Sequence, residues 1–202
     1  MTMTMRSRAR RAGIVMAAVA GGAVVAAGGV WWAIQGDGNV HVLEAGVAIR
    51  SAQPSGARLA DIVRTYGVRS VVNLRGPNAG QPWYDEEMAA SKSLGLAHVD
   101  IALSARQELT PAQLAAVLER VAQAPKPVLI HCNGGSDRTG LVSAAWVWRR
   151  GGSAEDAGKQ LAVRYGHFPW LGSRTVAMDR SLAAFEASPR APLPVDAASA
   201  PG

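Results

Sequence analysis

The 202-residue chain contains a single cysteine, Cys132. One cysteine excludes an internal disulfide, and the sequence has no Cys-x-x-Cys pair or Cys/His cluster that would predict a zinc site. The chain is basic overall, with a net charge of +6, but it lacks a stripe of Lys and Arg. Four arginines precede residue 12, and residues 37–190 carry 17 Lys and Arg against 14 Asp and Glu. We therefore expect no nucleic-acid partner.

Residues 12–34 form 23 consecutive positions without a charged or strongly polar side chain. About 20 such residues suffice for a transmembrane helix. Arginines precede the segment, and Trp31 and Trp32 lie near its far end, where aromatic side chains anchor helices at the membrane interface. This pattern predicts a basic cytoplasmic N-terminus over residues 1–11, a single-pass anchor in the cell membrane, and an extracytoplasmic domain after Asp37.

A cleaved signal peptide is the alternative interpretation of the same segment, and it would leave the domain secreted or periplasmic. Arg10 and Arg11 before the apolar run are also compatible with twin-arginine export. All three interpretations export the domain.

The rest of the chain divides into a linker over residues 35–39, a folded domain over residues 40–187 and a tail over residues 188–202. The tail is rich in Pro, Ala and Ser and is expected to be disordered. The predicted strands span residues 40–43, 47–49, 70–74, 97–103 and 128–130. The predicted helices span residues 59–66, 83–94, 111–121, 141–148, 154–165 and 174–186. Strands that alternate with helices predict an α/β fold, with a central, largely parallel sheet flanked by helices.

A loop rich in glycine and small polar residues, 131–140, joins the buried strand at 128–130 to a strongly apolar helix. Ligands of α/β proteins bind beyond the carboxyl ends of such strands. Gly134 and Gly135 permit a tight backbone in which successive N–H groups form an anion nest, and the helix adds its positive N-terminal end. The sequence therefore predicts a phosphate-binding loop.

Cys132 opens this loop and Arg138 closes it, with five residues between them. Converging amides and a helix N-terminus would stabilise the Cys132 thiolate. The planar guanidinium of Arg138 matches two phosphate oxygens, so that it can stabilise charge during phosphoryl transfer. Thr139 can donate its hydroxyl to the sulfur, and His131 is expected to support the loop.

Residues 131–140 resemble the signature loop of the cysteine-based protein tyrosine phosphatase superfamily, His-Cys-x5-Arg-Thr-Gly. Residues 50–54, 72–75 and 165–170 resemble further segments of a small bacterial branch close to dual-specificity phosphatases. The resemblance implies attack by the cysteine, a phosphocysteine intermediate and hydrolysis by water, without a metal or other cofactor. The implied substrate is a phosphorylated protein or a small phosphoester. The implied phosphate-binding residues are Asn133, Gly134, Gly135, Ser136, Asp137, Arg138 and Thr139.

The general acid is the unsettled part of this prediction, because the stretch 104–108, where the resemblance leads us to expect an Asp, contains none. Three carboxylates compete. Asp137 lies inside the loop and is our choice, although it could instead pin the loop through backbone hydrogen bonds. Asp100 has a plausible spacing to the cysteine but alternates with apolar residues in a strand. Glu108 lies on the expected segment but directly before a helix cap, where the helix dipole alone would favour it.

The loop contains no Lys, which argues against polyphosphorylated inositides as substrates, although Arg75, Arg106 or Lys159 could compensate from outside it. A phosphoinositide or other small phosphoester phosphatase therefore stays an alternative. A phosphate-binding pseudophosphatase is another, since the upstream Asp is missing. A sulfurtransferase also places a cysteine after a strand, but the positions of Arg138 and Thr139 argue against it. Export would place a reactive thiolate in an oxidising compartment without a second cysteine to protect it.

Overall fold

The computed structural model describes residues 10, 13–19, 21, 22, 25, 28, 29, 36–191 and 193. Its centre is a five-stranded sheet with the order β1-β2-β5-β3-β4. Only β1 runs antiparallel to its neighbour; β2, β5, β3 and β4 pair in parallel. The strands are β1 (His41–Glu44), β2 (Ala48–Ser51), β3 (Ser70–Asn73), β4 (Ala97–Asp100) and β5 (Val128–His131). The predicted largely parallel α/β sheet is confirmed.

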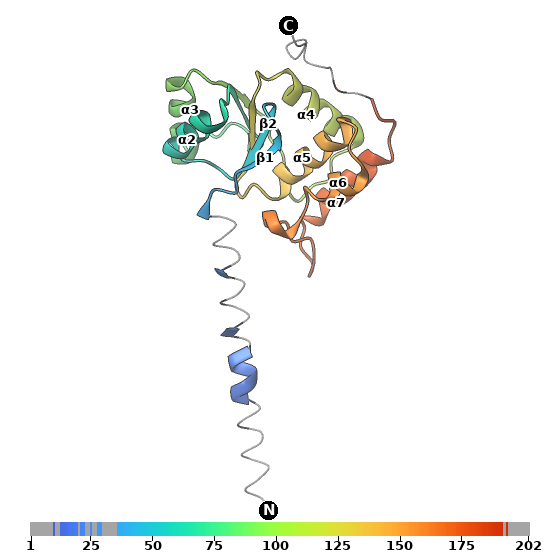
Figure 1. Ribbon diagram of the computed structural model, residues 1–202. Coiled ribbons are helices and arrows are strands. Elements are labelled where there is room, and N and C mark those ends of the chain that lie inside the picture. Colours follow the sequence, from blue (N-terminus) through green and yellow to red (C-terminus); the bar gives the residue numbers. More distant parts are fainter. Residues whose placement is uncertain are drawn as a thin grey trace, which may run out of the picture.

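Two layers of helices cover the sheet (Figure 1). One layer holds α2 (Gly56–Tyr66) and α3 (Pro82–Ser93), and the other holds α4 (Pro111–Gln123), α5 (Asp137–Arg149), α6 (Ala154–Gly158) and α7 (Val176–Glu186). The side chains of β5 alternate between the layers: Val128 and Ile130 join the core with α4, α5 and α7, whereas Leu129 packs with α2. Both faces of β5 are buried, as expected for a strand whose residues Val128–Ile130 form a continuous apolar run.

Most helix boundaries follow local signals that the sequence already carries. Gly67 ends α2 in the left-handed conformation with φ 67°, and its N–H donates to Val63 O. Thr110 caps α4 with a complete capping box to Gln113. These predictions are confirmed because they depend on residues only a few positions apart.

The predicted helix over 154–165 is wrong. The structure has the short α6, a turn and a single 3₁₀ turn, η1 (Val163–Tyr165). The helix ends at Gly158, a residue that costs conformational entropy in a helix. Two residues later the carbonyl of Gln160 accepts a hydrogen bond of 2.9 Å from the Arg50 side chain. A contact with a distant strand therefore replaces the helical path.

The predicted helix over 141–148 is too short. In the structure α5 begins at Asp137, so the last residues of the predicted loop form the first turn of this helix. First-turn N–H groups have no partner within their own helix. The helix start therefore lies inside the phosphate-binding segment and directs these amides toward it.

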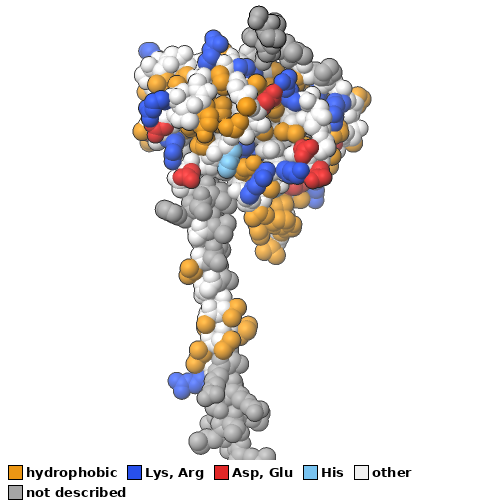
Figure 2. Space-filling view, in the orientation of Figure 1, with side chains coloured by type: hydrophobic (Ala, Val, Ile, Leu, Met, Phe, Trp, Pro, Cys, Tyr) orange, Lys and Arg blue, Asp and Glu red, His pale blue; other side chains and the backbone are white. Residues whose placement is uncertain are grey.

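The segments predicted as cytoplasmic N-terminus, membrane anchor and disordered tail lie largely outside the described residues. Residues 13–19 are helical, and Ile14, Val15 and Met16 are exposed. Within the described part of the chain, no helix combines the length and the apolar character needed to cross a membrane. Figure 2 shows hydrophobic side chains gathered at the lower end of the domain, where the N-terminal segment leaves it.

Candidate active site

The candidate nucleophile lies at the end of the middle strand of the sheet. Cys132 follows β5, which pairs with β2 on one side and β3 on the other. The thiol is free and its residue is only 2% exposed. Residues 133–136 link it to the start of α5. The predicted loop thus occupies the carboxyl edge of the parallel strands, where α/β folds bind ligands.

Three successive carbonyls of the loop, those of Asn133, Gly134 and Gly135, accept hydrogen bonds from the surrounding scaffold. The donors are the backbone N of Gln53 (3.0 Å), Nδ2 of Asn39 (2.9 Å) and Nη2 of Arg50 (2.7 Å), respectively. In a planar trans peptide the next N–H points away from the carbonyl. The N–H groups of residues 134–136 therefore face the inside of the loop, as an anion nest requires.

Only glycine fits at position 135, because any side chain would clash with the neighbouring backbone. Its φ of 70° lies in the left-handed region, and an added Cβ would stand 2.6 Å from the backbone N of Ala52 and 2.7 Å from the carbonyl of Ser51. The loop backbone thus presses directly against the end of β2. This close contact explains a glycine that the sequence indicated only as a flexible position.

Arg50 is a structural support for the loop, a role that the motif at residues 50–54 did not reveal. The residue is fully buried, and its guanidinium joins Gly135 O to both the carbonyl and the side-chain oxygen of Gln160. It also lies 3.8 Å from the centre of the Tyr165 ring. Burial lowers the pKa of Arg50 to about 10.

Arg138 and Thr139 lie in the first turn of α5. Arg138 Nη1 is 3.4 Å from Leu74 O and 3.3 Å from Leu103 O, on the segments that follow β3 and β4. These contacts hold one side of the guanidinium against the sheet edge. Thr139 is fully buried, and its hydroxyl has no hydrogen-bond partner among the described residues. Such a hydroxyl remains able to donate to a nearby anion.

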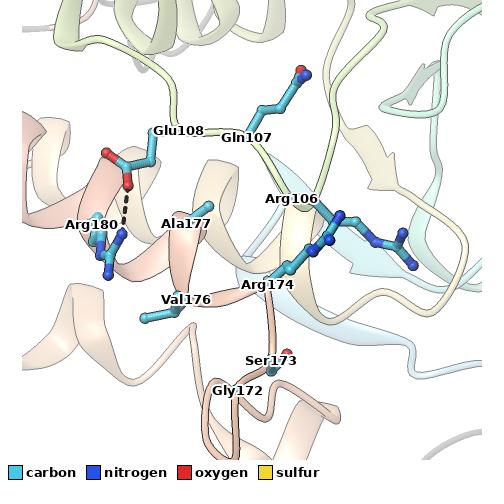
Figure 3. Close-up of a pocket in the computed structure, with 9 residues that line it drawn as sticks. All are labelled: Arg106, Gln107, Glu108, Gly172, Ser173, Arg174, Val176, Ala177 and Arg180. Atoms are coloured by element: carbon cyan, nitrogen blue, oxygen red, sulfur yellow. Dashed lines mark hydrogen bonds and ion pairs between the residues drawn. The ribbon is translucent and has the colours of Figure 1, made fainter.

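Glu108, one of the three candidate acids, is engaged elsewhere. It lines an open pocket of about 560 Å³ between the segment 106–108 and the start of α7. Figure 3 shows its carboxylate pointing toward Arg180, with which it forms an ion pair of 3.1 Å. Both side chains are more than half exposed, so the pair is weak. The guanidinium of Arg106 has no ion-pair partner in the described part of the chain.

Asp100, the second candidate, is held by its neighbours at the end of β4. It accepts hydrogen bonds from Asn73 Nδ2 at 2.8 Å and from the Tyr84 hydroxyl at 2.6 Å. The hydrogen bond to Asp100, together with burial, raises the pKa of Tyr84 to about 12. These contacts favour a structural role for Asp100 that links β3, β4 and α3.

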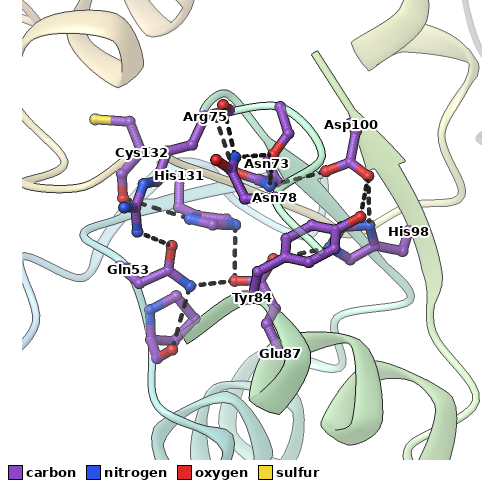
Figure 4. A network of polar contacts seen from close by, with 12 residues as sticks. Gln53, Asn73, Arg75, Asn78, Tyr84, Glu87, His98, Asp100, His131 and Cys132 are labelled. Atoms are coloured by element: carbon purple, nitrogen blue, oxygen red, sulfur yellow. Dashed lines mark hydrogen bonds and ion pairs between the residues drawn. The ribbon is translucent and has the colours of Figure 1, made fainter. Parts of the chain in front are cut away.

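Beneath the loop lies a buried polar network centred on Glu87 of α3 (Figure 4). Its carboxylate is 3.1 Å from His131 Nε2 and 2.8 Å from His98 Nε2, and it also accepts a hydrogen bond from Gln53 Nε2. Burial alone would raise the pKa of Glu87, but the hydrogen bonds from His131 and His98 outweigh it and lower the pKa to about 2. Glu87 is therefore a carboxylate that fixes the ring of His131.

His131 in turn contacts the backbone of the nucleophile, because its Nδ1 lies 3.4 Å from the carbonyl of Cys132. The sulfur itself points away from the network in Figure 4. Glu87 was not predicted as a site residue, although its position carries a signal: Tyr84, Glu87 and Ser91 are the buried residues of α3 and share one helical face. A charged residue on the buried face of a helix indicates a partner in the interior.

Asp137, the third candidate, contacts a histidine that lies 30 residues later in the chain. Its Oδ1 lies 2.7 Å from Nδ1 of His167, whose Nε2 lies 3.0 Å from Oδ2 of Asp179. His167 is almost fully buried. Burial alone would lower the pKa of His167, but the hydrogen bonds to the two carboxylates outweigh it and raise the pKa. This bridge ties the loop to α7. The sequence marked residues 165–170 only as a segment that resembles the family, without indicating the contact of His167 with Asp137.

Comparison with known proteins agrees with this geometry. A family model described as "Tyrosine phosphatase family" matches residues 34–157, more than half of the chain. No curated protein sequence matches.

Several solved structures share the fold. TpbA from P. aeruginosa superposes with a TM-score of 0.56 at 18% identity, over 73% of this chain and 88% of its own. The core catalytic domain of the PP-IP phosphatase SIW14 from S. cerevisiae gives 0.57 at 20% identity, over 70% and 83%. Tk-PTP gives 0.55 at 23% identity, over 73% and 95%. With Cys132 at the head of the loop and the family match across the sheet, the chain belongs to the tyrosine phosphatase family, within the cysteine-based protein tyrosine phosphatase superfamily.

Proposed function

We propose that the protein hydrolyses phosphomonoesters through a phosphocysteine intermediate, and that it is a tyrosine or dual-specificity protein phosphatase, whose substrates are proteins phosphorylated on tyrosine or also on serine and threonine. The observation that carries the proposal is that three successive loop carbonyls point outward and accept hydrogen bonds from the scaffold. The amides that follow them therefore point toward the space between Cys132 and Arg138. Amides and a guanidinium around one thiol suit a tetrahedral phosphate and the charge of its transition state.

In the proposed reaction, the Cys132 thiolate attacks phosphorus while the bond to the leaving oxygen breaks. Arg138 and the loop amides hold the three equatorial oxygens, on which charge is spread. Asp137 gives a proton to the departing oxygen and then takes one from the water that hydrolyses the phosphocysteine. The free hydroxyl of Thr139 supports departure of the sulfur, which leaves as a thiolate. His131 and Glu87 hold the loop from below.

We further propose that residues 12–34 anchor the protein as a single-pass membrane protein, with the domain outside the cytoplasm. The support is the uncharged 23-residue segment behind four arginines, together with its two tryptophans. A linker of only five residues, 35–39, joins this segment to the domain. The domain therefore stays close to the end of the anchor.

A turnover assay of the full chain in detergent, with a metal chelator present, tests the activity. We expect hydrolysis of p-nitrophenyl phosphate and inhibition by vanadate, which resembles the transition state of phosphoryl transfer. A panel of phosphopeptides, phosphoinositides and nucleotides then separates the substrate classes. TpbA has been crystallised with phosphotyrosine, and SIW14 is a PP-IP phosphatase, so both classes belong in the panel. Tight phosphate binding without any turnover would identify a pseudophosphatase instead.

The role of Asp137 is tested by Asp137→Asn. If Asp137 protonates the leaving group, the substitution lowers kcat by about 10²–10³-fold with an alkyl or phenyl phosphate, whose oxygen leaves poorly without a proton. The loss with p-nitrophenyl phosphate should be much smaller, because its leaving group is stable as an anion. The measurement is kcat for both substrates, wild type against variant.

Asp179→Asn is the matched control, because it removes the charge of the other carboxylate that contacts His167 without changing the loop carboxylate. An equal loss with both substrates in Asp137→Asn, reproduced by Asp179→Asn, would assign Asp137 to holding the loop and not to proton transfer.

A further inference from the structure

A small cluster of apolar side chains projects from the domain between η1 and α7. Phe168 is 51% exposed, Trp170 53% and Leu171 96%. Large apolar side chains this close together are seldom left in water without a binding role. We call residues 168–171 the apolar tip. In Figure 1 the segment between α6 and α7 projects from the end of the domain where the N-terminal segment departs.

The tip has a defined conformation. Gly166 and Gly172 flank it with φ of 87° and 78°, and Leu171 has a φ of 56°. A branched side chain seldom adopts the left-handed region. The rings of Phe168 and Trp170 meet edge to face with 4.7 Å between their centres. The backbone thus holds Leu171 in the left-handed conformation, and its side chain points outward into solvent.

The base of the tip is bonded to the point where the N-terminal segment enters the domain. Asn39 Nδ2 donates to Tyr165 O at 2.9 Å, and the His41 ring packs against the Tyr165 ring with 4.8 Å between centres. Only five residue steps separate Ile34 from Asn39. A fully extended chain spans at most about 18 Å over five residues. The end of an anchor over residues 12–34 therefore cannot lie far from the tip.

The charges beside the tip suit an anionic surface. Arg164 precedes it and Arg174 follows it, and both are exposed. Arg164 lies over the Tyr165 ring at 4.6 Å and donates to the carbonyl of Lys159 at 3.2 Å, and it forms no ion pair with a carboxylate in the described part of the chain. Aromatic and leucine side chains flanked by arginines are the combination found where proteins enter the lipid headgroup region.

We propose that the apolar tip inserts into the outer surface of the lipid bilayer that holds the N-terminal anchor. This inference rests on the proposed anchor. The same Asn39 side chain that reaches Tyr165 also binds Gly134 O, so the phosphate-binding loop lies at the membrane-facing end of the domain. His167, inside the tip's own loop, holds Asp137. Docking thus places the candidate active site next to the membrane surface, within reach of phosphoesters located there.

The test uses the full chain in vesicles of phosphatidylcholine and phosphatidylglycerol. A Cys132→Ser background removes the native thiol, and Leu171→Cys then carries an environment-sensitive fluorophore. We expect a blue-shifted emission and at least threefold stronger quenching by doxyl-labelled lipid than for the same label at Gln123→Cys. Gln123 is an exposed residue at the end of α4, which leads into the start of β5, and so lies at the opposite edge of the sheet from Cys132.

Quenching at position 171 no stronger than at position 123 would overturn the proposal, as would a label that responds only when a phosphoprotein is added. Phe168→Ser with Trp170→Ser in the labelled chain should lower the quenching at position 171 severalfold, and unchanged quenching would remove these rings from the contact. Extraction of the chain with alkaline carbonate tests the anchor separately, so the failure of the anchor and the failure of the docking give different results.

Discussion

Replacing Cys132 by serine is expected to lower kcat by about 10⁴-fold or more, because a serine hydroxyl in the same place is a far weaker nucleophile than a thiolate. The phosphate-binding groups remain, since the loop amides and Arg138 are untouched. Binding of a phosphorylated ligand should therefore survive. The measurements are kcat with p-nitrophenyl phosphate and the Kd of a phosphopeptide for the variant, which binds the peptide without hydrolysing it.

The chain supplies its own control for this experiment, because Cys132 is its only thiol. Alkylation of the wild type with iodoacetate should abolish activity in step with modification of one thiol, and vanadate should protect it. The serine variant should take up no reagent. A Cys132→Ser protein with full activity would exclude the phosphocysteine mechanism, whatever the fold.

Arg138→Lys has the second-largest expected effect, a loss of about 10²–10³-fold in kcat/KM. The substitution keeps the positive charge but removes the planar fork that can donate to two phosphate oxygens at once. Lysine also cannot reproduce the contacts of Nη1 with the carbonyls of Leu74 and Leu103, which place the side chain at the sheet edge. Charge alone should not rescue the geometry.

Arg180→Lys is the matched control for that substitution, because Arg180 is exposed and forms an ion pair with the exposed Glu108, away from the loop. It should retain activity close to wild type. Circular dichroism and the melting temperature of both variants check that the fold persists. If Arg138→Lys were as active as Arg180→Lys, bidentate recognition by Arg138 would play no part in the reaction.

Local signals in the sequence were enough to predict much of the fold. The cap at Thr110, the glycine that ends α2 and the apolar strand at 128–130 involve residues close together in the chain, and each agrees with the structure. The helix over 154–165 failed because a distant contact decided it. The buried guanidinium of Arg50 takes the carbonyl of Gln160, 110 positions away.

The position of the phosphate-binding loop and its cysteine could be predicted from the sequence for two reasons. Five residues separate Cys132 from Arg138, a spacing that is visible in the sequence, and the strand and helix on either side place the loop between them. What supports the loop could not be predicted. Its carbonyls are held by Asn39 and Arg50, 95 and 85 residues away, and Asp137 is held by His167. Such partners meet only when the sheet and both helical layers have assembled. The tertiary structure therefore decided the direction of the loop amides, the buried Glu87 below His131 and the exposure of the apolar tip, because each depends on which distant segments pack together.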